Sequence, residues 1–377
     1  MLNRRNPIRI AVISHSYIVD DNRGKVECLA KLPGLDVLLV VPRRWKNRDT
    51  GQAFRASVPS EGGLRVIAVA AWSVGSGSLI TYSPMGLWNT LRHFRPDVIH
   101  LEEEPWSLAA LELSWLSPLL RIPLAVFSWE NLDRGLALPF RLIRRRVLRV
   151  TRGAVTGNTE GLTLLEAQGF TGNAAVLPQL GVDTAAFPPA ASRPRGVVGY
   201  VGRLVPQKGI HILLKAMARI ANPCRLMIVG RGPIRDELIR KARELGLNGR
   251  FELHEEVGHG DVPAYMARMS ILVLPSLTTP IWKEQFGHVL IEAMASGLPV
   301  IGSDSGAIPE VIGNAGLVVR EGDVEALATA IERLLSDSSL HAQLAALGRE
   351  RVASNYTNEV VAQRLGSFLG RIVSGES

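Results

Sequence analysis

The chain has 377 residues, of which 46% are hydrophobic and 21% are charged, and its formal net charge is +8. This length is more than one hydrophobic core needs and suits two domains, and the composition excludes a disordered chain. The two cysteines, Cys28 and Cys224, are far apart in the sequence and in no metal-ligand spacing, so they imply neither a disulfide framework nor a zinc site.

The N-terminal half contains short apolar runs with helix-length segments between them. Runs that are apolar on both faces are typical of parallel strands in βαβ units. We predict strands at residues 9–14, 36–41, 97–101, 123–127 and 153–158. The apolar run after the N-terminal arginines is too short for a signal peptide, so we expect a cytoplasmic protein.

Polar side chains follow two of these strands. In open parallel sheets, ligands bind beyond the carboxyl ends of the strands. His15 follows the first predicted strand, and the acids Glu102, Glu103 and Glu104 follow the third. The acids could bind substrate hydroxyl groups or assist in removing a proton. The alternative is that one acid points inward and two are solvated, and for His15 ligand contact and no contact are equally open.

Six arginines interleave with Leu, Ile and Val at roughly helical spacing in residues 141–152. They form either a solvated helix face whose arginine stems cover apolar surface, or a patch that binds anionic lipid or nucleic acid. The apolar stretch before them is interrupted by Pro118, Arg121 and Pro123, so we expect no membrane span. Membrane contact would therefore be peripheral, at the inner face.

Residues 177–196 are rich in proline and glycine and are typical of a linker. Beyond it, a second series of apolar runs predicts strands at residues 196–202, 225–230, 250–254, 270–275 and 298–303. We therefore predict an α/β chain with two doubly wound, Rossmann-like domains, residues 1–185 and 186–355. A C-terminal helix at 356–377 is expected to pack back toward the N-terminal domain.

The first strand of the second series leads into a loop with two glycines and two cations, in the sequence GYVGRLVPQKGIHILLKAM. Gly202 and Gly209 let the backbone come close to a ligand, while Arg203 and Lys208 place positive charge at a helix entrance. An arginine fork and a mobile lysine together suit a diphosphate. The alternative is a basic, solvated turn.

Two carboxylates stand eight positions apart in the sequence KEQFGHVLIEAMASGLP. If Glu284 and Glu292 were both helical, they would stand about 12 Å apart, too far to act as acid and base on one bond. The spacing suits a long ligand with hydroxyl groups at both ends and negative charge between them, facing the amides near Gly287, His288 and Val289. The alternative makes Glu284 a first-turn acid and Glu292 a solvated residue.

The segment PSLTTPIWKEQFGHVLIEAMASGLPVIGSDSGAIPEVI resembles the donor-site signature of family four retaining glycosyltransferases, which have the GT-B fold. VGRLVPQKG, IVGRGP and GVDTAAF extend this resemblance, which covers nearly the whole chain. It implies two Rossmann-like domains that face an interdomain cleft, with the nucleotide sugar on the C-terminal domain. It also implies hexosyl transfer from a UDP- or GDP-sugar to a saccharide or lipid-linked acceptor, with retention of configuration, by front-face attack and without a metal or other cofactor.

The resemblance also assigns roles to single residues. Arg203 and Lys208 would neutralise the diphosphate, and Glu284 would hold hydroxyl groups of the donor sugar. The further donor contacts would be Gly24 in the first loop and, in the second domain, Gly202, Arg231, Val257, Phe286, Gly287, His288, Val289 and Glu292. Of these, Glu292 would bind the ribose hydroxyls and Val257 would contact the base through its backbone.

The sequence departs from the family pattern in its first half. The first loop offers Gly24 alone, where the family often has two glycines. Trp129, Glu130 and Asn131 occupy the region in which many members carry a histidine of the acceptor cleft. These three residues join His15 and the three acids as candidates for the acceptor side.

Two other functions stay open. A sugar-nucleotide 2-epimerase shares the two-domain architecture, and a non-catalytic protein could keep nucleotide-sugar binding and contact a membrane through the basic helix. The intact set of Arg203, Lys208, Glu284 and Glu292 argues against a loss of donor binding. The expected partners are a nucleotide sugar and a saccharide or lipid-linked acceptor, with an anionic membrane at residues 141–152 as a further candidate; no nucleic acid is expected.

Overall fold

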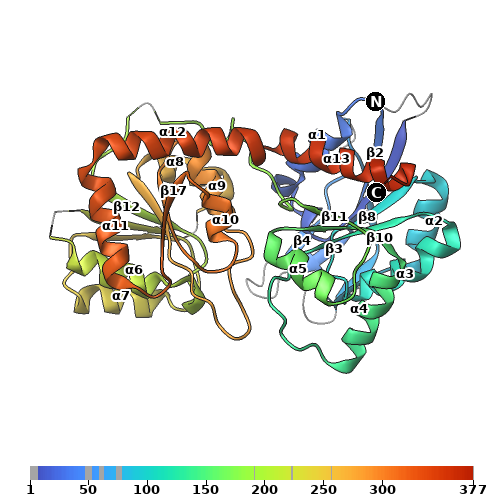
Figure 1. Cartoon of the computed structure of the whole chain (residues 1–377), viewed down its shortest axis with the longest axis horizontal. Coiled ribbons are helices and arrows are strands. Elements are labelled where there is room, and N and C mark those ends of the chain that lie inside the picture. Colours follow the sequence, from blue (N-terminus) through green and yellow to red (C-terminus); the bar gives the residue numbers. More distant parts are fainter. Residues whose placement is uncertain are drawn as a thin grey trace. The chain divides into compact units, whose positions relative to one another are not determined.

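A computed structural model describes residues 7–46, 53–58, 63–73, 79–190, 192–221, 224–255 and 257–376. The chain divides into two compact units, which we call unit 1 and unit 2 (Figure 1). Unit 1 comprises Met1–Gly181 and Asn358–Ser377, and unit 2 comprises Val182–Thr357. This division differs by a few residues from the expected boundaries at 185/186 and 355/356. The C-terminal segment belongs to unit 1.

Unit 1 is built on a parallel sheet with the strand order β11-β10-β9-β8-β1-β2-β5. Its strands are β1 (Ile8–Ile13), β2 (Leu35–Pro42), β5 (Arg65–Val69), β8 (Val98–Leu101), β9 (Leu124–Ser128), β10 (Thr151–Thr156) and β11 (Asn173–Val176). Two hairpins stand apart from this sheet: β3 (Arg44–Lys46) with β4 (Ala53–Arg55), and β6 (Ala71–Ser73) with β7 (Ile80–Tyr82). The strand order reverses between β1 and β8, and ligands bind at the carboxyl edge of such a reversal.

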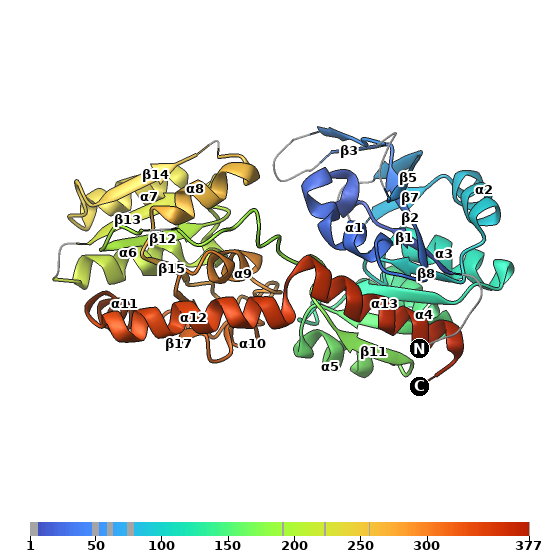
Figure 2. The ribbon, with the colours of Figure 1, turned by 90° about the horizontal axis from the view of Figure 1, so that it is seen from above.

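Helices cover both faces of this sheet (Figure 1; Figure 2). Successive residues of β1 point to opposite faces, so its side chains divide between two apolar clusters. Ile10 and Val12 join an apolar cluster with residues of two helices, α1 (Gly24–Ala30) and α13 (Asn358–Ser374). Ala11 and Ile13 join a second cluster with residues of α2 (Pro84–Phe94), α3 (Leu108–Leu120), α4 (Leu138–Val150) and α5 (Thr159–Ala167). Burial on both faces explains why β1 is a continuous apolar run.

Unit 2 contains a second parallel sheet, with the order β14-β13-β12-β15-β16-β17. Its strands are β12 (Val197–Val201), β13 (Arg225–Val229), β14 (Phe251–His254), β15 (Ile271–Leu274), β16 (Val300–Ser303) and β17 (Gly316–Val319). Its helices are α6 (Ile210–Arg219), α7 (Arg235–Glu244), α8 (Val262–Ala267), α9 (His288–Ala295), α10 (Ile308–Ile312), α11 (Val324–Ser336) and α12 (Ser338–Asn355). The order reverses between β12 and β15, so the loops after these two strands lie at the switch point.

The two doubly wound sheets confirm the predicted fold class, and each predicted strand is present within about two residues of its expected bounds. The sequence did not predict β5, β11 and β17, which are edge strands. The basic helix was predicted to reach residue 152, but α4 ends at Val150. Thr151 and Arg152 instead begin β10, where the Thr151 hydroxyl donates to the Val147 carbonyl oxygen over 2.9 Å.

Candidate functional site

The two loops at the switch point of unit 2 pack backbone against backbone. The loop after β12 ends at Gly209, whose φ of 65° suits glycine. A Cβ added at this position would collide with the Pro275 carbonyl oxygen in the loop after β15. The Leu277 amide donates to the Gln207 carbonyl oxygen over 2.8 Å. This close approach requires glycine at position 209 and brings together the two loops that carry Lys208 and Glu284.

Lys208 and Glu284 form an ion pair where these loops meet. The Lys208 Nζ lies 2.6 Å from the Glu284 Oε2, and the Ser276 hydroxyl donates to the same oxygen over 2.7 Å. Glu284 is only 6% exposed, and the Lys208 ammonium lies 5.1 Å from the centre of the Trp282 ring. The predicted cation and the predicted sugar-binding acid are therefore direct neighbours, although 76 residues separate them in sequence.

Helix α9 begins after Gly287, which has a φ of 77°. Because Glu284 precedes this helix, the distance of about 12 Å expected for two helical glutamates does not apply. The alternative that Glu284 is an acid of the first helical turn is wrong. Glu292 lies inside α9 and is 5% exposed, which also excludes the solvated alternative. The His288 Nδ1 lies 3.0 Å from the Glu292 Oε1, and this neighbour one turn earlier fixes the carboxylate. Phe286 and Val289 pack at the edge of the core of unit 2.

Two exposed arginines follow neighbouring strands at the same edge. Gly202 and Arg203 follow β12, and Arg231 lies just after β13. The Leu204 amide donates to the Arg231 carbonyl oxygen over 2.9 Å, which ties the two loops together. The buried Tyr200 hydroxyl donates to the Arg203 carbonyl oxygen over 2.8 Å. Burial, with a further contribution from the Glu284 carboxylate, raises the pKa of Tyr200 well above its usual value, so this donor stays protonated.

Val257, the predicted base contact, is half-buried after β14, and it packs on the core of unit 2. The residue before it, Glu256, lies outside the described residues. Gly24, the predicted donor contact of the first loop, is the first residue of α1 in unit 1. A Cβ on Gly24 would collide with the Asn358 side-chain nitrogen, so a larger residue at position 24 would have to displace that amide.

All three acids after β8 are buried in unit 1, so the expectation that two of them are solvated is wrong. Glu102 accepts from the Lys25 Nζ over 2.6 Å and from the Tyr17 hydroxyl over 2.7 Å. Burial alone would raise the pKa of Glu102, but Lys25 and His100 lower it to about 2. Glu102 is thus a buried carboxylate with its own cation. Lys25 was not among the predicted site residues, because its signal in the sequence is a single lysine near the start of a helix.

His15 and Glu103 form a dyad. The His15 Nδ1 lies 2.6 Å and 2.8 Å from the two Glu103 oxygens, and the His15 amide donates to the Glu103 Oε1 over 2.8 Å. Burial lowers the pKa of His15, but the Glu103 carboxylate outweighs this and leaves the pKa above its usual value. Because Nδ1 donates to Glu103, Nε2 is the nitrogen that accepts in the neutral ring. A histidine held by a fully buried carboxylate is a common arrangement of a general base.

Glu104 accepts hydrogen bonds from the Ser128 hydroxyl over 2.8 Å and from the Trp129 amide over 2.7 Å. Burial, with Glu130 as a second negative charge, raises the pKa of Glu104 to about 8. Glu130 is held by Arg134 over 2.5 Å, and the Asn131 amide donates to Glu160 over 3.3 Å. These acceptor-side candidates come together after β8 and β9.

Glu104→Gln should raise the free energy of unfolding at pH 8 and leave it nearly unchanged at pH 4. The pKa of Glu104 is about 8 in the folded protein against an ordinary value of 4.5, so the folded protein keeps a proton that the unfolded chain releases. Stability is therefore lost as the pH rises through this window, by an amount on the order of a few kcal/mol. Urea unfolding of both proteins at pH 4, 6 and 8 measures the effect. A difference that does not change with pH would contradict the assignment.

The chain is similar to known proteins over most of its length. A family model described as "Glycosyl transferases group 1" matches residues 183–351. A GDP-mannose-dependent alpha-(1-6)-phosphatidylinositol monomannoside mannosyltransferase of Mycolicibacterium smegmatis is 31% identical over 294 residues, which are 72% of this chain and 77% of that protein. The lipopolysaccharide core biosynthesis glycosyltransferase LpsE of Rhizobium meliloti is 33% identical over 194 residues, a match that spans 51% of this chain and 53% of that protein.

Two solved structures resemble both units. Sucrose-phosphate synthase from Thermosynechococcus elongatus has a TM-score of 0.73 at 23% identity, over 98% of this chain and 100% of that chain. The Anabaena protein HepE in complex with UDP has a TM-score of 0.74 at 18% identity, over 96% of this chain and 99% of that chain. At these identities the likeness shows the fold alone.

Proposed function

Because the chain belongs to the group 1 glycosyl transferases, we propose that it moves a hexosyl group from a nucleotide sugar to a saccharide or lipid-linked acceptor. In this proposal the transfer retains the anomeric configuration and needs no metal ion. The donor is a UDP- or GDP-sugar. A GDP-sugar is the first to test, because the Mycolicibacterium smegmatis relative is named as GDP-mannose-dependent.

The ion pair between Lys208 and Glu284 carries this proposal. In a nucleotide sugar, the bond that breaks joins the sugar to the diphosphate. The group that holds the sugar hydroxyls and the group that takes up phosphate charge must therefore be neighbours. The Lys208 Nζ and the Glu284 Oε2 are 2.6 Å apart at the switch point of unit 2. Glu284 suits the sugar and Lys208 suits the diphosphate, with Arg203 on the same loop as a second cation.

In the proposed step, the bond between the anomeric carbon and the diphosphate oxygen breaks, and the diphosphate leaves with the electron pair. The acceptor oxygen bonds to the anomeric carbon from the same face and loses its proton. Negative charge grows on the diphosphate, and Lys208, Arg203 and the first amides of α9 stabilise it. Glu292, held by His288, takes the ribose hydroxyls at the far end of the donor, and Val257 contacts the base.

We assign the acceptor proton to the His15–Glu103 dyad of unit 1. The Glu103 carboxylate holds Nδ1, so the Nε2 of His15 is the acceptor nitrogen, and the side chain of His15 is 15% exposed. The neighbouring candidates are less suited, because Glu102 is neutralised by Lys25 and burial keeps Glu104 protonated near neutral pH. His15 therefore accepts the proton, and the buried carboxylate stabilises the resulting imidazolium.

A thermal-shift panel of UDP- and GDP-sugars in EDTA tests donor binding without metal. A ligand that binds only the folded protein stabilises it by about 2.7 kcal/mol at 100 times its Kd, which raises the Tm by about 5 °C or more for a unit of this size. We expect one sugar nucleotide to give this shift, and its sugar to appear on an added acceptor. No shift from any nucleotide sugar would contradict the proposal. Isomerised donor without transfer would favour the 2-epimerase, and binding without turnover would favour the non-catalytic protein.

The second part of this proposal is that the protein binds peripherally to an anionic membrane through α4. None of the helices in the described ranges is long and apolar enough to cross a membrane. Leu138 and Leu142 of α4 are 65% and 57% exposed, and Trp115 and Leu119 of α3 are also exposed. Exposed leucines interleaved with arginines are typical of a helix that lies on an anionic lipid surface.

The protein should sediment with vesicles of phosphatidylcholine and phosphatidylserine at low salt, and release should follow as salt screens the arginines. The double variant Leu138→Ser and Leu142→Ser should weaken this binding several-fold, because it removes apolar insertion and leaves the charge unchanged. The matched control is Val318→Ser, which removes an exposed apolar side chain in unit 2. Equal binding to neutral and anionic vesicles at low salt would contradict the proposal.

A further inference from the structure

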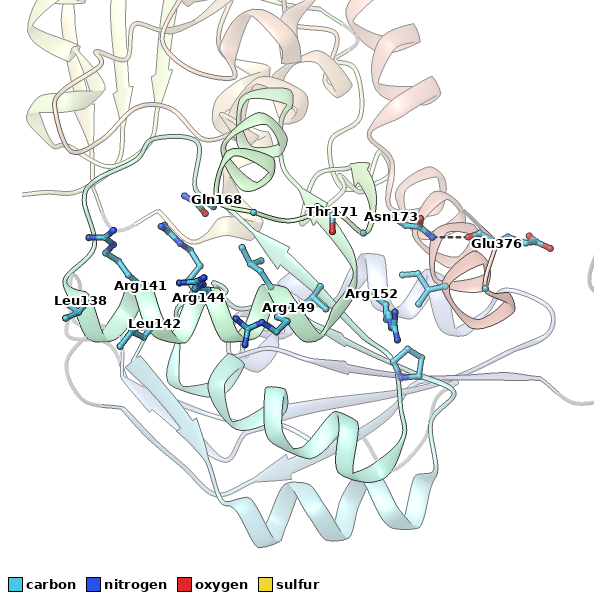
Figure 3. A pocket seen from close by; sticks show the side chains of 18 residues that line it. Leu138, Arg141, Leu142, Arg144, Arg149, Arg152, Gln168, Thr171, Asn173 and Glu376 are labelled. Carbon is cyan, nitrogen blue, oxygen red and sulfur yellow. Dashed lines mark hydrogen bonds between the residues drawn. The ribbon is translucent and has the colours of Figure 1, made fainter.

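A basic cavity of about 1020 Å³ lies in unit 1 beside α4. Figure 3 shows arginines of α4 and Arg152 on one side of it, and Gln168, Thr171 and Asn173 on the other. Among the described residues, five arginines and one carboxylate, that of Glu376, line this cavity. The arginines are Arg141, Arg144, Arg145, Arg149 and Arg152. The cavity therefore carries a strong excess of positive charge.

This cavity and the acceptor-side cluster lie at opposite ends of the strands of the unit 1 sheet. Pro123 precedes β9, Thr151 begins β10 and Asn173 begins β11, so the cavity opens at the amino ends of parallel strands. His15 and Trp129 instead follow the carboxyl ends of β1 and β9. The five residues of β9 place about 16 Å between the two edges. The cavity is thus separate from the groups to which we assign the transfer.

Two buried donors in the cavity have no acceptor among the described residues: the Arg144 Nη1 and the Gln168 Nε2. Buried polar groups are nearly always hydrogen-bonded, and leaving one unsatisfied is costly. Arg146 of the same helix differs, because it donates to the Ser114 hydroxyl over 3.1 Å and points away from the cavity. The unsatisfied donors are therefore a property of the cavity and not of α4 as a whole.

We propose that this cavity binds a lipid head group that carries two or more phosphates. Phosphate oxygens would satisfy the Arg144 and Gln168 donors, and several negative charges would match five arginines against one carboxylate. The volume is that of a site for a whole small molecule and far exceeds the needs of one phosphate. The exposed side chains of Leu138 and Leu142 also line the cavity, which places apolar surface where the acyl chains would continue.

This inference rests on the membrane contact proposed for α4 and is independent of the proposed transfer. It adds that α4 recognises a head group and does not only sense surface charge. Diffuse attraction depends on the number of arginines, whereas a head-group site depends on which side chains line it. Gln168 separates the two cases, because it is neutral and diffuse attraction does not involve it.

The test is sedimentation of the full chain with two kinds of phosphatidylcholine vesicle. One carries phosphatidylinositol bisphosphate, and the other carries phosphatidylserine at the same total charge. We expect at least tenfold stronger binding to the first. Arg144→Gln and Gln168→Leu should each reduce this preference roughly tenfold or more, since each removes a hydrogen bond to a charged group. The control Arg146→Gln removes the same charge from the same helix outside the cavity, and it should keep the preference.

Circular dichroism and thermal melts of each variant check folding. Equal losses in Arg144→Gln and Arg146→Gln, with none in Gln168→Leu, would overturn the proposal in favour of diffuse charge. Micromolar inorganic pyrophosphate that releases the protein from the bisphosphate vesicles would also overturn it, by showing that the site takes a free anion. Retained vesicle binding without turnover would leave this inference standing and contradict only the transferase proposal.

Discussion

Lys208→Met should lower the turnover of sugar transfer by about 10²-fold to 10³-fold, while the protein stays folded. The loss in rate follows because charge develops on the departing diphosphate, and a fixed cation at that place stabilises the transition state. The same change leaves Glu284 buried, 6% exposed, without its cation. Removing one partner of a buried ion pair costs about 3–5 kcal/mol of stability. The single variant should therefore be both slow and less stable.

The double variant Lys208→Met and Glu284→Gln separates these two effects. It also removes the buried charge of Glu284, so most of the lost stability should return, whereas turnover should stay as low as in the single variant or lower. Lys215→Met is the matched control, because Lys215 is an exposed lysine on the adjacent helix α6. Steady-state rates and urea unfolding of the four proteins measure both quantities. Near wild-type turnover in the double variant would remove Lys208 and Glu284 from the site.

The sequence predicted the inner strands and one edge strand, β14, and it missed the other three edge strands. Inner strands such as β1 and β15 are buried on both faces and appear as continuous apolar runs. The edge strands β5, β11 and β17 are only partly buried, and each carries just three or four consecutive apolar residues, which is too short a run to indicate a strand by itself. Their existence depends on the neighbouring strand that they pair with, which a local pattern cannot reveal.

In the candidate site, too, some features follow from the sequence and others depend on the fold. The cations and acids of unit 2 could be predicted because glycines and a helix start mark them in the sequence. Their pairing could not, since Lys208 and Glu284 lie 76 residues apart and meet only because Gly209 lets two loops touch. The burial of Glu102 and Glu103 could not be predicted either, since their partners Lys25 and His15 come from the start of the chain.

The basic cavity shows a further limit of the sequence. The arginines of α4 are visible as a pattern, but Gln168 follows the last residue of α5 and Glu376 lies near the C-terminus. Only the fold brings these residues to one place. The arginine pattern alone fits a solvated helix face as well as an anion site, and the residues that favour a head-group site come from other parts of the chain.

His15→Gln should lower turnover by about 10²-fold or more and leave donor binding within about twofold. The reason is that the proposed general base lies in unit 1, whereas the donor contacts lie in unit 2. Glu103→Gln tests the same dyad through the pH dependence. The Glu103 carboxylate raises the pKa of His15, so its removal should lower that pKa and shift the rising limb of the rate profile to lower pH. The plateau should also fall, because the histidine becomes a weaker base.

A merely structural role for the dyad would give a different pattern. Loss of packing would lower the rate at every pH without moving the limb, and it would lower the Tm in proportion. The measurement is kcat from pH 5 to 9 for the wild type, His15→Gln and Glu103→Gln, with Tm and nucleotide-sugar affinity determined on the same samples. His93→Gln on α2 serves as a histidine control outside the cluster. An unchanged rising limb of the pH profile in Glu103→Gln, or near wild-type kcat in His15→Gln, would assign the acceptor proton to another group. Glu104 would then be the next candidate above pH 8, where its carboxyl group ionises.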